Sequence, residues 1–282
     1  MTLKCHSRGS VYNIAIRRGG AALSAQIVDF SIGSELGALS GAVCGAAIGS
    51  YLATLALRWP EGRSAAAGRS HCDSCGITIP TLRMIPMLSW TMQGGRCHAC
   101  GSRIAVTHPL LEVCGALIGA LSGGLFHGAP TLACATAAFG MLLLLAATLD
   151  LRHFWLPDRL SLAMAVAGLA VNALGLGPGL VPALAGALAG YGSLWLIARA
   201  YRALRGREGL GGGDAKLLGA IGAWTGWSGL PWIVLGASLA GLAAVLVLVL
   251  RGGSAGGAMR LPLGTLLAVA AWPIWIVLAL AF

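Results

Sequence analysis

Eight apolar runs divide this chain of 282 residues into segments that suit the thickness of a lipid bilayer. They lie at about 37–57, 109–128, 131–149, 160–177, 180–198, 215–227, 230–250 and 261–281. An α-helix crosses the hydrocarbon core, about 30 Å thick, in about 20 residues. The runs do not alternate with a period of two, which favours helices over barrel strands. The sequence therefore predicts an all-α, polytopic membrane protein with about eight transmembrane helices.

Arginine is distributed unevenly among the loops between these runs. It occurs in the loops after the first, third, fifth and seventh runs, whereas the loops near 128–130, 177–179 and 228–229 carry no charge. Cytoplasmic loops of membrane proteins are enriched in Lys and Arg, so we place the basic loops in the cytoplasm. The net charge of +10 is explained by this topology. We therefore expect membrane lipid, and no nucleic acid, as a partner.

The N-terminal tail, residues 1–36, does not fit this topology. It would lie outside the cell, yet it contains Lys4, Arg8, Arg17 and Arg18. Either the later loops dominate the orientation, or the protein starts further downstream than this sequence does. We favour the second explanation.

Residues 58–108 form the one long polar segment between apolar runs, and they contain two Cys-x-x-Cys pairs. The pairs are Cys72 with Cys75 and Cys97 with Cys100, separated by 21 residues. Two such turns brought together make a tetrahedral four-thiolate site, and a reducing cytoplasm argues against disulfides. An insert of about 50 residues has little core of its own, so a metal would supply folding energy. We predict a zinc-ribbon-like insert with structural zinc; a redox pair, or a fold that has lost its metal, is the alternative.

Two acidic residues, of nine in the chain, stand at the ends of apolar runs. Asp150 closes the third run and Asp214 opens the sixth, so the predicted topology brings both to the cytoplasmic face. Ionisable groups at such positions are functional candidates. Two carboxylates that share a proton can activate a water and protonate a scissile carbonyl, as in aspartyl proteases. The glycines before Asp214, including Gly211 and Gly213, allow close approach of an extended peptide.

Structural roles are the alternatives for these carboxylates. Asp214 follows a loop, where Asp favours the helix N-cap. Asp150 is alternatively a solvated boundary residue or the ion-pair partner of Arg152. Asp158, directly after a proline, is predicted to be an N-cap, with catalysis as the alternative. Lys216 is expected to neutralise or orient a neighbouring carboxylate, or simply to mark the cytoplasmic side.

The motifs together resemble those of the type IV prepilin peptidases, bifunctional leader peptidases and N-methyltransferases of bacterial inner membranes. The stretch "DLRHFWLPD" is similar to the first aspartate motif of that family, and "GLGGGDAKLLGAIGAWTGW" to its second, the GxGD element. The insert follows the family order with "SHCDSC", "IPMLSW", "GGRCHACGSRI" and "HPLLE". The resemblance runs from about Gly37 to the C-terminus. Other GxGD proteases, the presenilin-like ones, lack the CxxC insert.

This resemblance implies that Asp150 and Asp214 are the catalytic pair, supported by residues around them. It also implies prepilin or pseudopilin substrates, cut on the cytoplasmic side after a glycine that precedes an apolar helix. S-adenosylmethionine is the implied methyl donor, and Glu112 is a candidate for that half of the enzyme; its alternative is a boundary residue that faces the insert. The supporting residues are Gly211, Gly213, Lys216 and Asp158. The expected layout is a first helix at 37–57, the insert at 58–108 and a seven-helix peptidase core at 109–282.

Two other classes of function compete with this interpretation. A cation-coupled transporter would use broken helices and buried acids near the bilayer midplane, whereas these acids lie at the edge. A non-catalytic pilus or secretion assembly factor would tolerate Asp150→Asn. The sequence leaves the oligomeric state open.

Overall fold

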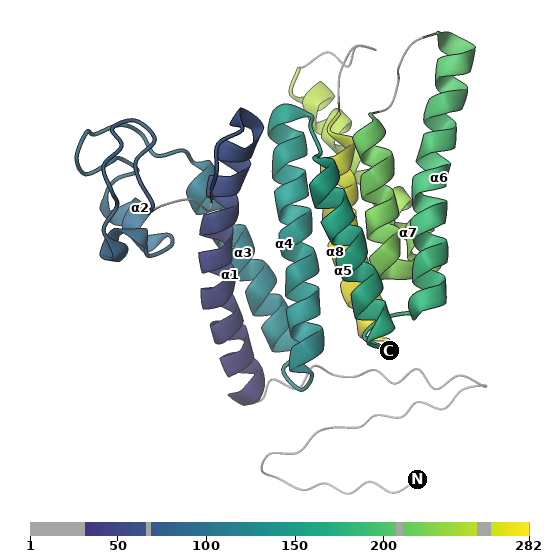
Figure 1. Cartoon of the computed structure of the whole chain (residues 1–282), viewed down its shortest axis with the longest axis horizontal. Coiled ribbons are helices and arrows are strands. Elements are labelled where there is room, and N and C mark those ends of the chain that lie inside the picture. Colours follow the sequence, from purple (N-terminus) through teal and green to yellow (C-terminus); the bar gives the residue numbers. More distant parts are fainter. Residues whose placement is uncertain (1–31, 66–68, 207–210, 253–260, 282) are drawn as a thin grey trace, which may run out of the picture.

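The computed structural model describes residues 32–65, 69–206, 211–252 and 261–281. The long helices stand side by side, and the insert projects from one flank of the bundle (Figure 1). Within the described residues there is no strand, only two isolated bridges, so the all-α class is confirmed. The helices are α1 (Ile32–Arg58), α2 (Leu88–Met92), α3 (Thr107–Leu125), α4 (Pro130–His153), α5 (Asp158–Ala173), α6 (Leu180–Arg205), α7 (Gly212–Leu250) and α8 (Leu263–Ala279), with 3-10 turns at Trp59–Glu61 and Thr81–Met84.

Five helices are long and apolar enough to cross a membrane, namely α1, α3, α4, α6 and α7, and α8 is a shorter apolar helix. The predicted runs at 215–227 and 230–250 correspond to two helices under the one label α7, joined at Gly226, where the backbone is not helical (φ 69°, ψ 177°). The run predicted at 160–177 ends earlier as a helix, at Ala173. Most of the predicted tail, residues 1–31, lies outside the described residues, and α1 begins before residue 37.

Asn172 on α5 stabilises the break in α7. Its side-chain nitrogen lies 3.0 Å from the Ala223 carbonyl and 3.2 Å from the Trp224 carbonyl, just before Gly226. Its side-chain oxygen accepts a hydrogen bond from Gly179 N at 3.0 Å. Carbonyls freed at a helix break inside a membrane need such partners, because no water is there to replace them. A buried amide therefore lets α7 turn back towards the face from which it starts.

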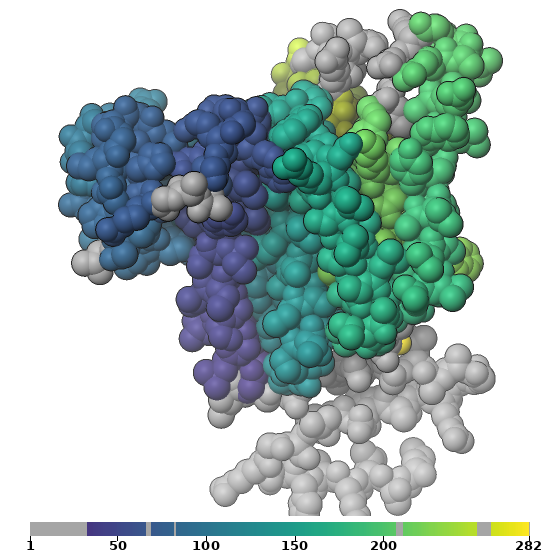
Figure 2. Space-filling model, viewed as in Figure 1, coloured from purple at the N-terminus to yellow at the C-terminus, as the bar shows by residue number. Residues whose placement is uncertain are grey.

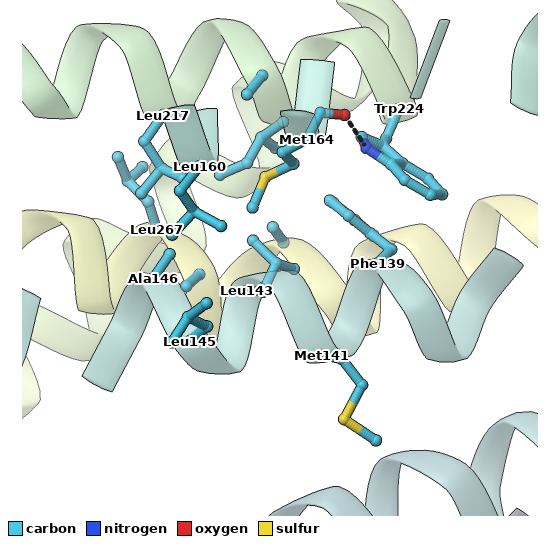
Figure 3. Packing of buried hydrophobic residues seen from close by; sticks show 14 of the residues in the cluster. Phe139, Met141, Leu143, Leu145, Ala146, Leu160, Met164, Leu217, Trp224 and Leu267 are labelled. Atoms are coloured by element: carbon cyan, nitrogen blue, oxygen red, sulfur yellow. Dashed lines mark hydrogen bonds between the residues drawn. The ribbon is translucent and has the colours of Figure 1, made fainter. Parts of the chain in front are cut away.

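Aromatic side chains pack α4 against α7 (Figure 3), and Trp275 joins α8 to the same cluster. Phe139 stacks on Trp224 with ring centroids 4.5 Å apart, and Trp275 meets both rings edge to face. Trp224 Nε1 donates a hydrogen bond of 2.8 Å to the Met164 carbonyl on α5. The indole is therefore both packed and satisfied, and it fixes α5 against α7. This core holds in register the helices that carry Asp150 and Asp214.

A ladder of glycines joins α1 to α3. A methyl group added at Gly41 would overlap the Gly119 carbonyl, and one added at Gly45 would overlap the Gly115 carbonyl. Small residues let the backbones of membrane helices approach closely. The high glycine content thus serves packing here and fixes α3, which follows the insert, against α1, which precedes it.

Candidate active site

Asp150 lies in the last turn of α4 and its side chain is buried, with 5% of its surface exposed. Its Oδ2 accepts a hydrogen bond from Thr265 N at 2.7 Å. Thr265 Oγ1 lies 3.1 Å from the same oxygen and 3.0 Å from the Ala147 carbonyl, so its single proton serves one of them at a time. Asp150 is therefore neither a solvated boundary residue nor a partner of Arg152, which donates instead to Thr107 Oγ1.

The start of α8 explains how a carboxylate is tolerated at the C-terminal end of α4. The negative end of a helix dipole disfavours an anion, whereas the free amides at a helix N-terminus favour one. Thr265 is in the first turn of α8, and its amide points at Asp150. The favourable terminus of α8 thus offsets the unfavourable terminus of α4.

Asp214 is the third residue of α7, directly after the stretch of glycines, and its side chain is partly buried. The N-cap of α7 is Gly211, and no side chain caps the helix, so the N-cap alternative for Asp214 is wrong. A Cβ added to Gly211 would lie 3.3 Å from Asp214 Oδ2. A Cβ added to Gly213 would lie 3.0 Å from the Leu156 side chain. Both predicted glycines therefore sit where any other residue would crowd the carboxylate or its neighbour.

Gly264 brings the two carboxylates together. Its backbone amide interacts with Asp214, which also experiences the charge of Asp150. A Cβ added to Gly264 would lie 3.0 Å from Asp150 Oδ2 and 2.9 Å from Leu156 Cδ1. Gly264 thus packs against Asp150 and acts on Asp214 through its amide, although the two acids are 64 positions apart in the sequence.

Gly264 and Thr265 are the site residues that sequence reasoning missed. They stand in "LPLGT", at the start of the last apolar run. A glycine and a hydroxyl residue in the first turn of a helix read as ordinary helix-start chemistry, so nothing in the local pattern pointed to Asp150. The position of that turn could have pointed to the site, because the predicted topology puts it at the same membrane face as both acids.

Asp158 and Lys216 form an ion pair next to this site. Pro157 is the N-cap of α5 and makes no side-chain capping bond, so the prediction that Asp158 is the N-cap is wrong. Asp158 lies in the first turn, where its Oδ1 is 2.5 Å from Lys216 Nζ. Both side chains are largely exposed, and Lys216 neutralises a neighbouring carboxylate as predicted, but that carboxylate is Asp158.

The four predicted cysteines meet in the insert. The sulfur atoms of Cys72, Cys75, Cys97 and Cys100 all lie within 4.8 Å of one another, and those of Cys72 and Cys100 are 4.0 Å apart. Tetrahedral zinc with Zn–S bonds of about 2.3 Å requires sulfur atoms about 3.8 Å apart. The backbone amides of Cys75 and Ser74 lower the pKa of the Cys72 thiol to about 6. The donor set therefore fits structural zinc.

Each cysteine pair sits on the same kind of turn. Gly76 N donates to the Cys72 carbonyl, and Cys72 N donates to the Ile77 carbonyl five residues later. The second pair has the same two bonds, from Gly101 N to the Cys97 carbonyl and from Cys97 N to the Ser102 carbonyl. The glycine after each pair, Gly76 and Gly101, has φ of 71°, a conformation that side chains disfavour. The sequence "CxxCG" thus encodes the turn as well as the ligands.

Buried charge fixes the insert to α1. The Arg58 guanidinium, at the end of α1, is 3.0 Å from Asp73 Oδ1, and Arg63 is 3.0 Å from the same oxygen. Partial burial opposes ionisation of Asp73, but Arg63 and Arg58 outweigh it and hold the pKa of that carboxyl below its ordinary value. Because Asp73 stands between Cys72 and Cys75, this pair connects the cysteine cluster to the membrane helices.

Glu112 on α3 is a buried anchor for the insert. Its Oε2 accepts a hydrogen bond of 2.6 Å from the Met87 amide. Met87 has a positive φ of 60°, which is uncommon for a residue other than glycine. Glu112 therefore faces the insert, as its alternative role predicted.

The segment after α4 connects the carboxylates with the insert. Leu156 packs against Gly213 and Gly264, beside the two acids. The preceding residue, Trp155, meets Trp59 edge to face with ring centroids 6.1 Å apart. Trp59 directly follows Arg58, the residue that holds Asp73. One short segment thus touches both functional regions.

Residues 137–246 match the type IV leader peptidase family, and residues 43–124 match the bacterial peptidase A24 N-terminal domain. A protein of Dickeya chrysanthemi is 42% identical over 199 residues, which cover 71% of this chain and 67% of the relative. One of Aeromonas hydrophila is 39% identical over 206 residues, covering 72% and 70%. No solved structure matches.

The chain belongs to the type IV leader peptidase family. Both relatives are named prepilin leader peptidase/N-methyltransferase, as is a protein of Burkholderia pseudomallei strain 1026b that is 42% identical over 186 residues. That alignment spans 65% of this chain but 59% of the relative. The names confirm the enzyme class predicted from the sequence and imply S-adenosylmethionine as a cofactor. They speak against the transporter and the assembly factor.

Proposed function

We propose that this chain removes the leader peptides of type IV prepilins or pseudopilins, with Asp150 and Asp214 as the catalytic pair, and then methylates the new N-terminus. The observation that carries the catalytic assignment is Gly264, which packs against the Asp150 carboxylate and acts on Asp214 through its amide. The acids belong to different helices, and nothing but the fold brings them together. Proteins of a purely structural kind have no need of a buried and a partly buried acid beside one glycine, since each is costly to bury.

The chemistry follows that of a carboxylate pair sharing one proton. The ionised carboxylate takes a proton from water while the water oxygen bonds to the scissile carbonyl carbon. The protonated carboxylate gives its proton to the carbonyl oxygen, which yields a neutral tetrahedral intermediate. A proton then passes to the amide nitrogen as the C–N bond breaks, leaving a carboxylic acid and a free amine. Gly211, Gly213 and Gly264 leave only enough space for the Asp214, Leu156 and Asp150 side chains that lie against them.

A cleavage assay with matched variants tests the pair. Prepilin is reconstituted with wild type, Asp150→Asn, Asp214→Asn or Asp158→Asn enzyme in vesicles, and leader release is followed. Loss of general acid–base catalysis costs about 10²–10⁴-fold in rate, so both dyad variants should fall by that factor. Methyl transfer to a pilin supplied without its leader should persist in both. Normal processing by either dyad variant would refute the assignment.

The methyl donor has a candidate site of its own, between the insert and the ends of α1 and α3. A cavity of about 350 Å³ lies there, lined by Arg58, Asp73, Trp90 and His108 among others. Trp90 Nε1 is buried and has no hydrogen-bond partner among the described residues. A buried donor without a partner costs free energy, which a ligand acceptor would recover. The residues present therefore fit a ligand with an aromatic ring and charged groups.

We assign this cavity to S-adenosylmethionine, which when bound supplies an electrophilic methyl group. Trp90 offers a ring for stacking and a donor for an adenine nitrogen, Asp73 suits the cationic groups, and Arg58 suits the carboxylate. The segment with Leu156 and Trp155 links the peptidase site to this region, which suits transfer to the amine that cleavage has just released. Glu112 would act here as a positioning residue, through Met87.

Binding of the methyl donor by itself tests this assignment. Trp90→Phe keeps the ring and removes the donor, so it should weaken S-adenosylmethionine binding in calorimetry by about fivefold, the value of one hydrogen bond. Prepilin cleavage should be unchanged. If Trp90→Phe and Trp90→Ala both bound S-adenosylmethionine with wild-type affinity, the cofactor site would have to lie elsewhere in the protein.

The remaining parts of the proposal concern layout and location. The first helix would act as an anchor. The insert at 58–108 would form the methyltransferase region, and the core at 109–282 would be the peptidase. The arginine-bearing loops support a site on the cytoplasmic side, and we propose the bacterial inner membrane as its location. Prepilin would then present its leader and scissile bond at that face.

A further inference from the structure

The apolar surface of the insert is unexpected for a segment outside the membrane helices. The residues Met84–Met92, which include α2, form what we call the apolar segment. Its members Leu88 and Met92 have 51% and 78% of their surfaces exposed. Met84, Ile85 and Met87 are also exposed. Leu88 and Met92 are four residues apart and so lie on one face of α2. Exposed apolar patches of this kind mark surfaces that bind something.

The hydrogen bond to Glu112 fixes the depth of the apolar segment. α3 has 19 residues, so it is about 28 Å long, close to the hydrocarbon thickness of about 30 Å. It needs nearly its whole length to cross. Glu112 lies five residues into α3, about 7.5 Å from its cytoplasmic end, and binds the Met87 amide. The apolar segment is therefore level with the membrane rather than above it.

The figures agree with this depth. Figure 1 shows α2 beside the upper part of α1 and α3, and not beyond the ends of these helices. In the space-filling view the insert likewise projects sideways at the level of the upper half of α1 (Figure 2). An insert at this height is positioned to meet the bilayer surface.

A basic cavity adjoins the apolar segment. It has a volume of about 490 Å³ and is lined by Arg83, Arg96, His98 and Met92 together with Ser89, Gln93 and Cys97. No acidic residue lines it, and neither arginine pairs with a carboxylate in the part of the chain that the structure describes. Arg96 donates one long hydrogen bond of 3.4 Å to the Gly101 carbonyl. Guanidinium groups beside an apolar surface suit the phosphate of a lipid and the start of its acyl chains.

We propose that the insert is a membrane-surface module: its apolar segment lies in the cytoplasmic leaflet, and Arg83 with Arg96 binds the headgroup of an anionic phospholipid. The occupant is lipid because the segment is level with the spanning helices and because its flank is basic. This contact would keep the insert against the bilayer from which the substrate helix emerges. Arg83 also lines the cavity that we assign to S-adenosylmethionine, whereas Arg96 and Met92 line the basic cavity alone.

Photo-crosslinking tests the depth. Benzoyl-phenylalanine is placed at Met92, or as a control at Arg69, an exposed polar position of the same insert, in full-length protein reconstituted in phosphatidylcholine–phosphatidylglycerol vesicles. Mass spectrometry should find lipid adducts at position 92 and few at position 69. Equal lipid labelling at the two positions overturns the proposal. So does a position-92 adduct that is mainly a second copy of the chain, or a prepilin when one is added.

Lipid selectivity tests the arginines. Native mass spectrometry compares phosphatidylglycerol with phosphatidylcholine retained by wild type, Arg83→Gln, Arg96→Gln, the double variant and Arg69→Gln. An arginine near an anionic surface contributes about fivefold in affinity, so each single variant should lose about that factor and the double variant more. Arg69→Gln should match wild type. Unchanged selectivity in the double variant overturns the headgroup site.

Discussion

The carboxylate pair depends on contacts between residues far apart in the sequence, whereas the cysteine cluster is built mainly from contacts between residues close together in the sequence. Asp150 receives its hydrogen bonds from Thr265, which is 115 positions away in the sequence. Gly264, in the same first turn of α8, packs against Asp150 and acts on Asp214 through its amide. The cysteines are presented by two turns that each close within five residues. The membrane region therefore supplies rigidity through helix packing, whereas the insert needs a metal to hold two local turns together.

This difference predicts how each site fails. Damage to the cluster should unfold the insert and leave the membrane helices intact, since their core is independent of it. Damage around Gly264 should disable cleavage without unfolding anything, because the helices stay packed. The experiments below separate these outcomes.

Loss of a zinc ligand should have the largest effect. We expect about one zinc per chain in wild type and far less in Cys97→Ser, because four thiolates make the site. Structural zinc contributes about 10–16 kcal/mol to the folding of small zinc domains, so hydrogen exchange of residues 69–105 should lose its protection. Atomic emission gives the metal content.

Cys134→Ser is the matched control, since Cys134 is an exposed cysteine on α4. It should retain zinc and protection. If a chelator removed the metal and left insert exchange unchanged, the insert would have to be stable by its own packing, and the contrast between the two regions would disappear.

The same difference in range explains what the sequence revealed. The cysteine site was predictable as a whole, because "CDSCG" and "CHACG" contain ligands, spacing and the glycine of the turn. The pair Asp150 and Asp214 was predictable as candidates, because topology brings both to one face. Gly264 and Thr265 were not, because their role depends on how α8 packs against α4. Asp158 was misassigned because Lys216, 58 positions away, decided its contact.

Gly264→Ala should have the next largest effect, on cleavage alone. The added methyl group would lie 3.0 Å from Asp150 Oδ2 and 2.9 Å from Leu156 Cδ1, so the acids must shift apart. A displacement of about 1 Å in an active site costs about 10²-fold in rate. Leader release from prepilin should fall by that factor, while S-adenosylmethionine binding stays normal.

Gly128→Ala provides the comparison, because an added Cβ there meets no atom within 4 Å. It should cleave at the wild-type rate. An equally active Gly264→Ala enzyme would show that the site tolerates a methyl group between its carboxylates and would weaken the peptidase assignment.

Glu112 variants should have an intermediate effect, confined to the insert. Glu112→Ala removes the acceptor of the Met87 amide, a partly buried hydrogen bond to a charged group that contributes about 1.5–3 kcal/mol, whereas Glu112→Gln keeps an oxygen there. We expect faster exchange at residues 84–92 and weaker methyl transfer in the alanine variant, with cleavage unaffected. If Glu112→Gln lost as much methyl transfer as Glu112→Ala, the charge of Glu112, and not its hydrogen bond to Met87, would be needed for that reaction.

The exposed pair of Asp158 and Lys216 should have the smallest effect. Exposed ion pairs contribute about 0.2–1 kcal/mol, and both side chains here are largely in solvent. Asp158→Asn and Lys216→Gln should therefore melt close to wild type and cleave prepilin at nearly the wild-type rate. Both changes together should be no worse than either alone, because each already breaks the same contact. The test matters because Asp158 lies just after the Asp150 motif and next to Leu156. Suppose that Asp158→Asn loses as much cleavage activity as Asp150→Asn, while Lys216→Gln keeps the wild-type rate. Asp158 would then be a third catalytic carboxylate rather than the partner of Lys216 in a surface ion pair.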